Sequence, residues 1–259
     1  MLPLLSLCLA AEPGVSFPPL PTGRPGVPVE LVLSWTDVRF RPAGPESAAY
    51  GPDMLAIGPD GAWAVVDAGG RRLLGSFGVL LIGAVDGVAF AADGDLLVQS
   101  HGVVLRYADG VEVGKVSVPP LVPGGARLLS EGEDVYARDV FGNDHPVARA
   151  PTVGGLEPAL ARGFAPGPVV RRSERGVVTR DGEVVVSGAL AARPVGACTL
   201  VEYGVRGAVS ARELRCDDGA YDLPVDGLYR PYAGVAASGA DVAWLDPRAD
   251  GLHLVRVSR

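Results

Sequence analysis

Short apolar segments separated by glycine-containing turns recur along this chain, and the clearest copy spans residues 54–77. Its apolar segments are 55–57, 62–66 and 71–77, and the turns between them are 58–61 and 67–70. Pro59 presets φ for the first turn, and Gly61 can take the positive φ that closes it. Three strands in so short a stretch leave no room for a helical crossover, so the pattern predicts antiparallel pairing.

The second segment of this copy, residues 62–66, is apolar at almost every position. A strand with one face in water would alternate apolar and polar residues instead. The run therefore predicts a sheet that is packed between two neighbouring sheets.

Weaker copies follow to the end of the chain, at residues 88–107, 126–148, 169–187, 195–215 and 235–257. The mean spacing is about 36 residues, which is in the range of short propeller blades. The pattern predicts an all-β fold, a β-propeller of antiparallel strands, with six blades fitting the length best. Five or seven blades remain open because the middle copies are poorly phased.

The chain before the first repeat divides into three parts. Residues 29–35 form a first strand well before the repeats, and we expect it to close the ring by joining the last blade. Residues 12–28 carry several prolines and predict an extended leader. We therefore expect a single propeller domain over residues 29–259.

Residues 1–11 (MLPLLSLCLAA) resemble a signal peptide, because an apolar run ends in small residues. The interpretation is export to the periplasm or the medium, and the alternative is a buried N-terminal strand. Lipidation of Cys8 is a weaker interpretation, because Leu7 stands where a small residue normally precedes the lipidated cysteine. No later apolar run approaches the length of a membrane helix.

The other two cysteines, Cys198 and Cys216, flank an expected hairpin with strands at 199–203 and 209–215. Folding this hairpin brings the two thiols opposite each other. A disulfide here would suit an oxidising compartment. The alternative is a pair of reduced, buried thiols.

Composition excludes some classes of protein. A hydrophobic content of 48% excludes a disordered chain, and 36 glycines with 23 prolines fit a fold with many turns. The net charge of −7 argues against nucleic acid as a partner, because such binding needs a basic surface.

The motifs IGPDG (57–61), AVVD (64–67) and RLL (72–74) together resemble a blade of the NHL-type propellers, and more loosely of the senescence-marker protein/gluconolactonase propellers. The resemblance implies six blades, a central channel lined by the first strand of each blade, and a binding site built from loops on one face. It does not imply one activity, because such relatives include lactone hydrolases, lyases and binding modules.

Asp67 and Asp246 match the aspartate that ends the second strand of such a blade, and Arg72 matches the following arginine. With Asp139, these aspartates are candidates for an acidic ring at the channel mouth, which could bind Ca²⁺ through oxygen ligands. The alternative is that each aspartate accepts backbone hydrogen bonds within its own turn.

A lactonase-like hydrolase is the enzymatic alternative. Such enzymes hold a divalent metal with Glu, Asp and Asn, but Asn143 is the single asparagine of this chain. The three histidines fall in three different repeats, and no nucleophile elbow, zincin or nucleotide-binding motif occurs. The sequence therefore favours a scaffold that needs no cofactor and binds a protein or small ligand in a bacterial cell envelope.

The candidate contact for a partner is Tyr229-Arg230-Pro231-Tyr232, in a segment between two repeats. Tyr and Arg are enriched at the centres of protein interfaces. The alternative is that Tyr229 and Tyr232 cover the edge of the core.

Overall fold

The computed structural model describes residues 15–45, 47–67, 72–83, 85, 87–91, 93–100, 103–117, 127–131, 134–138, 144–147, 170–172, 178–180, 183–186, 188–196, 198–205, 208–231 and 234–259. Within these residues the secondary structure is all β, apart from a single-turn 3-10 helix at Pro59–Gly61. No described helix is long and apolar enough to cross a membrane. The predicted signal peptide, with Cys8, lies outside the described residues.

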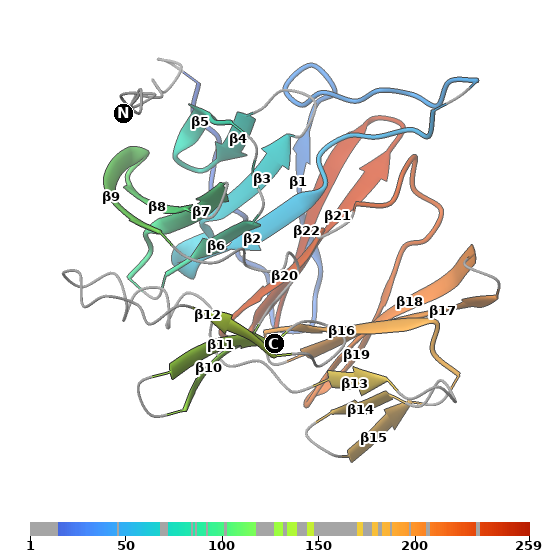
Figure 1. The fold of residues 1–259 in the computed structure, drawn as a ribbon. Helices are drawn as coiled ribbons and strands as arrows, with labels where there is room; N and C mark the ends of the chain where they lie inside the picture. The colour runs from blue at the N-terminus through green and yellow to red at the C-terminus, as the bar shows by residue number, and fades with distance from the viewer. Residues whose placement is uncertain are drawn as a thin grey trace.

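The described strands form separate antiparallel sheets (Figure 1). Two four-stranded sheets lie near the N-terminus, one of β2 (Met54–Ile57), β3 (Trp63–Asp67), β4 (Arg72–Gly75) and β5 (Gly78–Leu81), the other of β6 (Gly87–Phe90), β7 (Leu96–Ser100), β8 (Val103–Ala108) and β9 (Val111–Ser117). Two three-stranded sheets follow, of β10 (Arg127–Glu131), β11 (Asp134–Arg138) and β12 (Asp144–Val147), and of β13 (Val170–Arg172), β14 (Val178–Arg180) and β15 (Glu183–Val186).

Two further four-stranded sheets contain the remaining strands. One joins β16 (Ala191–Val195), β17 (Cys198–Val205), β18 (Ala208–Cys216) and β19 (Gly219–Leu223). The other joins β20 (Val235–Ser238), β21 (Asp241–Arg248), β22 (Gly251–Ser258) and the N-terminal strand β1 (Val29–Leu33). In Figure 1 the blue β1 lies beside the red β22, so strands from both ends of the chain share one sheet. The prediction of an all-β fold of antiparallel sheets is confirmed, and the architecture is consistent with a β-propeller.

The strand pattern differs from the sequence prediction in one respect. Each four-stranded sheet contains an outer strand that lies outside the predicted repeat or at its end, as β5, β9 and β19 do. These strands pair on one side only. β9 and β19 are largely in water, and Val111 and Val113 of β9 are both more than half exposed, so these two strands lack the apolar run that identifies a buried one. β5 is apolar and mostly buried, but it lies directly after the end of the predicted copy.

The turn after β2 is built as the sequence predicts. Gly61 has φ of +79°, and Asp60 also adopts a left-handed φ of +54°. A side chain at Gly61 would also collide with the backbone of Leu20, because an added Cβ would lie 2.6 Å from its carbonyl oxygen. Gly61 is thus required both by backbone conformation and by close packing.

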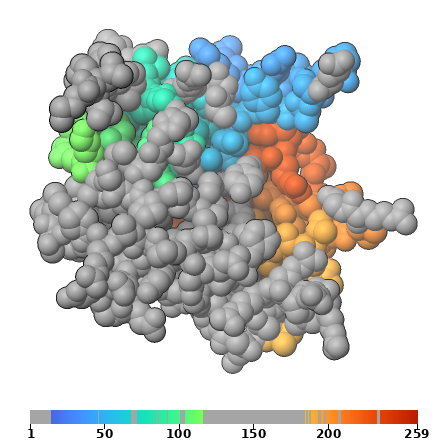
Figure 2. Space-filling model, in the orientation of Figure 1, coloured from blue at the N-terminus to red at the C-terminus, as the bar shows by residue number. Residues whose placement is uncertain are grey.

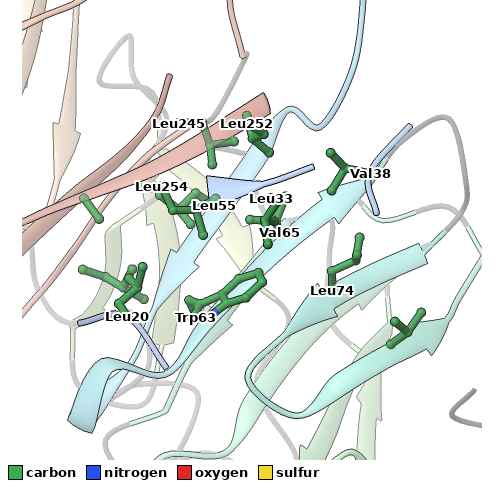
Figure 3. Close-up of a cluster of buried hydrophobic side chains, with 13 residues drawn as sticks. Leu20, Leu33, Val38, Leu55, Trp63, Val65, Leu74, Leu245, Leu252 and Leu254 are labelled. Carbon is green, nitrogen blue, oxygen red and sulfur yellow. The ribbon is translucent and has the colours of Figure 1, made fainter. Parts of the chain in front are cut away.

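The apolar strands of the first sheet bury both faces, as expected from residues 62–66. Successive side chains of a strand point to opposite faces. Val65 packs with Leu245 and Leu252 of the C-terminal sheet, whereas Val66 packs with Leu96 and Val98 of the second sheet. Figure 3 shows the first of these clusters, with Trp63 and Val65 beside the leucines of β21 and β22.

Residues before β1 take part in the same core. Leu20 is buried, its amide donates to the carbonyl oxygen of Gly61, and Phe17 makes an edge contact with Trp63. The indole nitrogen of Trp63 donates to the carbonyl oxygen of Pro18 at 2.8 Å. The proline-rich segment therefore covers the junction between the first and the last sheet.

The disulfide between Cys198 and Cys216 is present, as predicted from the hairpin. The two cysteines stand opposite each other at the open end of the β17–β18 hairpin, and both are buried. They pack with Leu200, Leu214 and Trp244 in the cluster between this sheet and the C-terminal sheet. The bridge therefore fixes a hairpin that contributes to an inter-sheet core.

Candidate functional site

The segment between β19 and β20, residues 224–234 (the crossover), is described at 224–231 and at 234, and these described residues lie against the end of β21. The amide of Leu228 donates to the carbonyl oxygen of Pro247 at 2.9 Å, and the amide of Leu245 donates to that of Gly234 at 2.8 Å. At Gly227 an added Cβ would lie 3.1 Å from the Pro247 carbonyl oxygen. Two backbone hydrogen bonds and a close approach therefore hold this crossover on the neighbouring strand.

A small pocket lies beneath the crossover, between the β16–β19 sheet and the C-terminal sheet. It is shallow and has room for about one water molecule. The polar side chains that line it are Arg212, Tyr229, Arg230 and Asp246, and the remaining lining residues are Pro224, Val225, Gly227, Pro231, Leu245 and Pro247. Figure 2 shows the orange hairpin and the red strands that flank this region side by side on one part of the surface.

Arg212 is the buried cation of the pocket, with only 6% of its surface exposed. It pairs across the β17–β18 hairpin with Glu202, and its Nε donates to Glu202 Oε1 at 3.1 Å. Burial lowers the pKa of the Arg212 guanidinium, the Glu202 carboxylate opposes that effect, and the nearby charge of Arg230 adds to it. Arg230 itself is exposed.

Tyr229 fixes the crossover to the N-terminal part of the chain. Its hydroxyl donates to the carbonyl oxygen of Pro52 at 2.8 Å, and its ring stacks on Phe40 with centroids 5.8 Å apart. Burial raises the pKa of the Tyr229 hydroxyl, and the carboxylates of Asp53 and Asp67 raise it further. The aromatic ring lines the pocket while its polar end is already hydrogen-bonded.

Asp67 lies at the end of β3 and is fully buried. Its Oδ2 accepts from Arg72 Nη2 at 2.7 Å, from Arg72 Nε at 3.2 Å and from the backbone amide of Arg39 at 3.3 Å. Asp53 lies nearby, and burial raises the pKa of its carboxyl, with a further contribution from the charge of Asp67. The Oδ1 atoms of both aspartates are buried and have no hydrogen-bond partner.

Asp246 belongs to a separate ionic network at the β21–β22 turn. Its Oδ2 accepts from Arg248 Nε at 2.6 Å. The Nη2 and Nη1 atoms of Arg248 also donate to the two carboxylate oxygens of Glu30, at 2.9 and 3.1 Å. His253 is buried between Glu30 and Asp250, at 3.0 and 3.1 Å. The network ties β1 to the C-terminal hairpin. The hydrogen bonds from Arg248 and His253 lower the pKa of the Glu30 carboxyl.

The predicted acidic positions of β3 and β21 occupy matching places in their sheets. Successive side chains alternate between faces, so Asp67 shares a face with Val65, which packs toward the C-terminal sheet. Asp246 shares a face with Trp244, which packs toward the β16–β19 sheet. Each aspartate therefore faces the sheet that precedes its own. Asp139 lies outside the described residues, and so does Tyr232.

Of the predicted contact residues, Tyr229 and Arg230 both line the pocket, as does Asp246. Sequence reasoning missed Arg212, because its place in the pocket depends on the pairing of three strands. Within the described residues no group of three or more His, Cys, Asp or Glu side chains is arranged to hold a metal ion.

No protein-family model and no curated protein matches the sequence. Among solved structures, a catalytically inactive virginiamycin B lyase from Staphylococcus aureus with quinupristin is 11% identical, at a TM-score of 0.38 over 88% of this chain and 98% of its own. A gluconolactonase from Xanthomonas campestris is 19% identical, at a TM-score of 0.27 over 97% of this chain and 90% of its own. Because these TM-scores lie below 0.5, the overlaps carry no conclusion about activity or ligand.

Proposed function

We propose that this protein is a non-catalytic, exported β-propeller that binds another protein of the bacterial cell envelope through the Pro224–Gly234 crossover. The observation that carries the proposal is the small pocket under that crossover, which is rimmed by two exposed apolar side chains and an exposed arginine. Val225 and Leu228 are 46% and 42% exposed, and Arg230 is exposed beside them.

The proposal includes six blades closed by β1. In support, the described strands fall into six consecutive sheets, and the first strand of the C-terminal sheet, β20, contacts β2, which in turn contacts β6. The first and last sheets share one core, and β1 pairs with β22 along its length. These contacts are among those that a closed ring requires, and they support the proposal.

The size of the pocket favours a protein partner over an enclosed small molecule. Small-molecule sites usually occupy about 300–1,000 Å³, whereas this pocket has room for about one water molecule. A hollow of this size can take no more than the tip of one side chain of a partner. An interface of this kind places an anchor in a pocket and surrounds it with flatter contacts.

The ionised groups near this region support a scaffold rather than a catalyst. Asp67 forms an ion pair with Arg72, and Asp246 forms one with Arg248, so both carboxylates are already paired within the protein. Arg248 also links β21 to Glu30 of β1. These pairs fix strand ends and therefore give the aspartates a structural role.

Export is proposed from the sequence of residues 1–11 and is supported by the Cys198–Cys216 bridge. Disulfides persist in the periplasm and outside the cell, where thiols are not kept reduced.

The test is to capture a partner from cell-envelope extract on the immobilised protein, identify it and measure its affinity. Replacing Val225 and Leu228 with Glu is expected to weaken binding at least tenfold, because charge would enter a desolvated contact. Replacing the exposed Val111 and Val113 of β9 with Glu is the matched control and should leave affinity unchanged. The proposal would be contradicted if the unaltered protein, the Val225/Leu228 variant and the Val111/Val113 variant bound the partner with equal affinity.

A metal-binding or lactonase-like enzyme is the second candidate, favoured by the two unpartnered, buried Oδ1 atoms of Asp53 and Asp67. Its test is thermal unfolding with and without millimolar Ca²⁺. A ligand at 100 times its Kd stabilises a protein by about 2.7 kcal/mol. A rise in Tm that Asp53→Asn abolishes would support the enzyme, and an unchanged Tm would support the scaffold.

A further inference from the structure

The pocket under the crossover carries more positive than negative charge. Arg212 and Arg230 both line it. Glu202 balances Arg212, and the carboxylate of Asp246 is already held by Arg248. Arg230 has no ion-pair or hydrogen-bond partner among the described residues. The guanidinium of Arg230 is therefore an unpaired positive charge at this site, although the whole chain carries a net charge of −7.

The buried arginine is oriented by one hydrogen bond only. Its Nε donates to Glu202, and no described residue accepts from its Nη atoms. Because Arg212 lines the pocket, this unused end of the guanidinium is the donor group available to a bound ligand. A guanidinium presents paired N–H groups that match the two oxygens of a carboxylate.

The walls of the pocket favour a small, fixed anion. Pro224, Pro231 and Pro247 supply three rigid, apolar surfaces, and backbone hydrogen bonds hold the crossover in place. A carboxylate carries one negative charge, which matches the one guanidinium of the pocket without an ion-pair partner among the described residues, that of Arg230. A phosphate group, with nearly two charges at neutral pH, would exceed it.

We propose that this pocket binds a carboxylate on an acidic side chain of the partner protein, held by the Nη groups of Arg212 and by Arg230. This inference rests on the proposed function and names the chemistry of its central contact. The apolar rim of Val225 and Leu228 would then cover the carbon atoms next to that carboxylate.

The test is NMR of the arginine Nε–Hε groups in the full chain, titrated with acetate at constant ionic strength. We expect acetate to shift the Arg212 signal until the site is saturated, and we expect neutral acetamide to leave the signal unchanged. Arg230→Gln should weaken the affinity for acetate about fivefold, which corresponds to the loss of an exposed ion pair of about 1 kcal/mol. Arg24→Gln, at another exposed arginine, is the control and should bind as the unaltered protein does.

Equal shifts with acetate and acetamide, tighter binding of inorganic phosphate, or no effect of Arg230→Gln would overturn the inference. The two proposals also fail separately. Acetate binding that depends on Arg230 supports the carboxylate site even if no partner is captured. A captured partner with unchanged affinity for the Arg230→Gln protein overturns the carboxylate site and leaves the scaffold proposal standing.

Discussion

The ion pair between Asp67 and Arg72 offers the sharpest test of a structural role for the predicted acidic residues. Asp67 is fully buried, whereas the Arg72 side chain is 17% exposed, and their charged atoms are 2.7 Å apart. Two unit charges at 4 Å attract by about 4 kcal/mol at an effective dielectric constant of 20. Removing the arginine leaves the buried carboxylate with only the Arg39 amide as a described donor.

We therefore expect Arg72→Met to lower the free energy of unfolding by about 3–5 kcal/mol, the usual cost of stranding a buried charge. Asp67→Asn should cost about 1–2 kcal/mol, because the amide can still accept from the backbone and the arginine can reach water. The double variant should be more stable than the sum of the two losses predicts, because it strands no charge.

The assay is urea unfolding at pH 7.5, followed by tryptophan fluorescence, since Trp63 is fully buried in the adjoining core. The matched control is Arg106→Met on the second sheet, whose partners Asp93 and Asp95 are 49% and 20% exposed. Water can solvate both carboxylates, so the expected loss is below about 1 kcal/mol. A loss below about 1 kcal/mol for Arg72→Met, additive with Asp67→Asn, would refute the structural role.

Three further outcomes are expected. Replacing Cys198 and Cys216 together with Ala should cost about 3 kcal/mol in urea unfolding, because the bridge closes a loop with a sequence separation of 18; reducing agent should then leave the variant's stability unchanged, and continued sensitivity would contradict the assignment. Tyr229→Phe should lower the free energy of unfolding by about 1 kcal/mol, because the hydrogen bond to the Pro52 carbonyl oxygen is lost. An unchanged midpoint of urea unfolding would contradict this. The pKa of Glu30 is lowered from its ordinary value of 4.5, so its stabilising effect is complete above that pH and is lost as the pH falls through the folded-state value. Glu30→Gln should flatten the acid side of the stability curve, and an identical acid profile would contradict this.

The sequence predicted those parts of the fold that depend on neighbouring residues. The hairpin between Cys198 and Cys216, the positive φ at Gly61 and the two-sided burial of β3 follow from turn chemistry and from apolar runs. Outer strands such as β9 could not be predicted in the same way. Their valines are exposed, and their position depends only on pairing with an inner neighbour.

The candidate site was predicted in part for the same reason. Tyr229 and Arg230 are adjacent in an irregular segment, and their residue types suggest a contact. Arg212 joins them only because β18 pairs with β19 so that Arg212 stands opposite Leu223, next to the start of the crossover. Such a juxtaposition depends on strand register, which one sequence does not specify.

Site-specific photo-crosslinking in intact cells tests the central claim most directly, with the cross-linking residue placed at Leu228 and, for comparison, at Val111. Both positions are exposed, but only the first lies on the Pro224–Gly234 crossover. We predict that Leu228 yields an adduct with one envelope protein, at a peptide that contains Asp or Glu, and that Val111 does not yield this adduct. No adduct at Leu228, or the same adduct at both positions, would contradict the account.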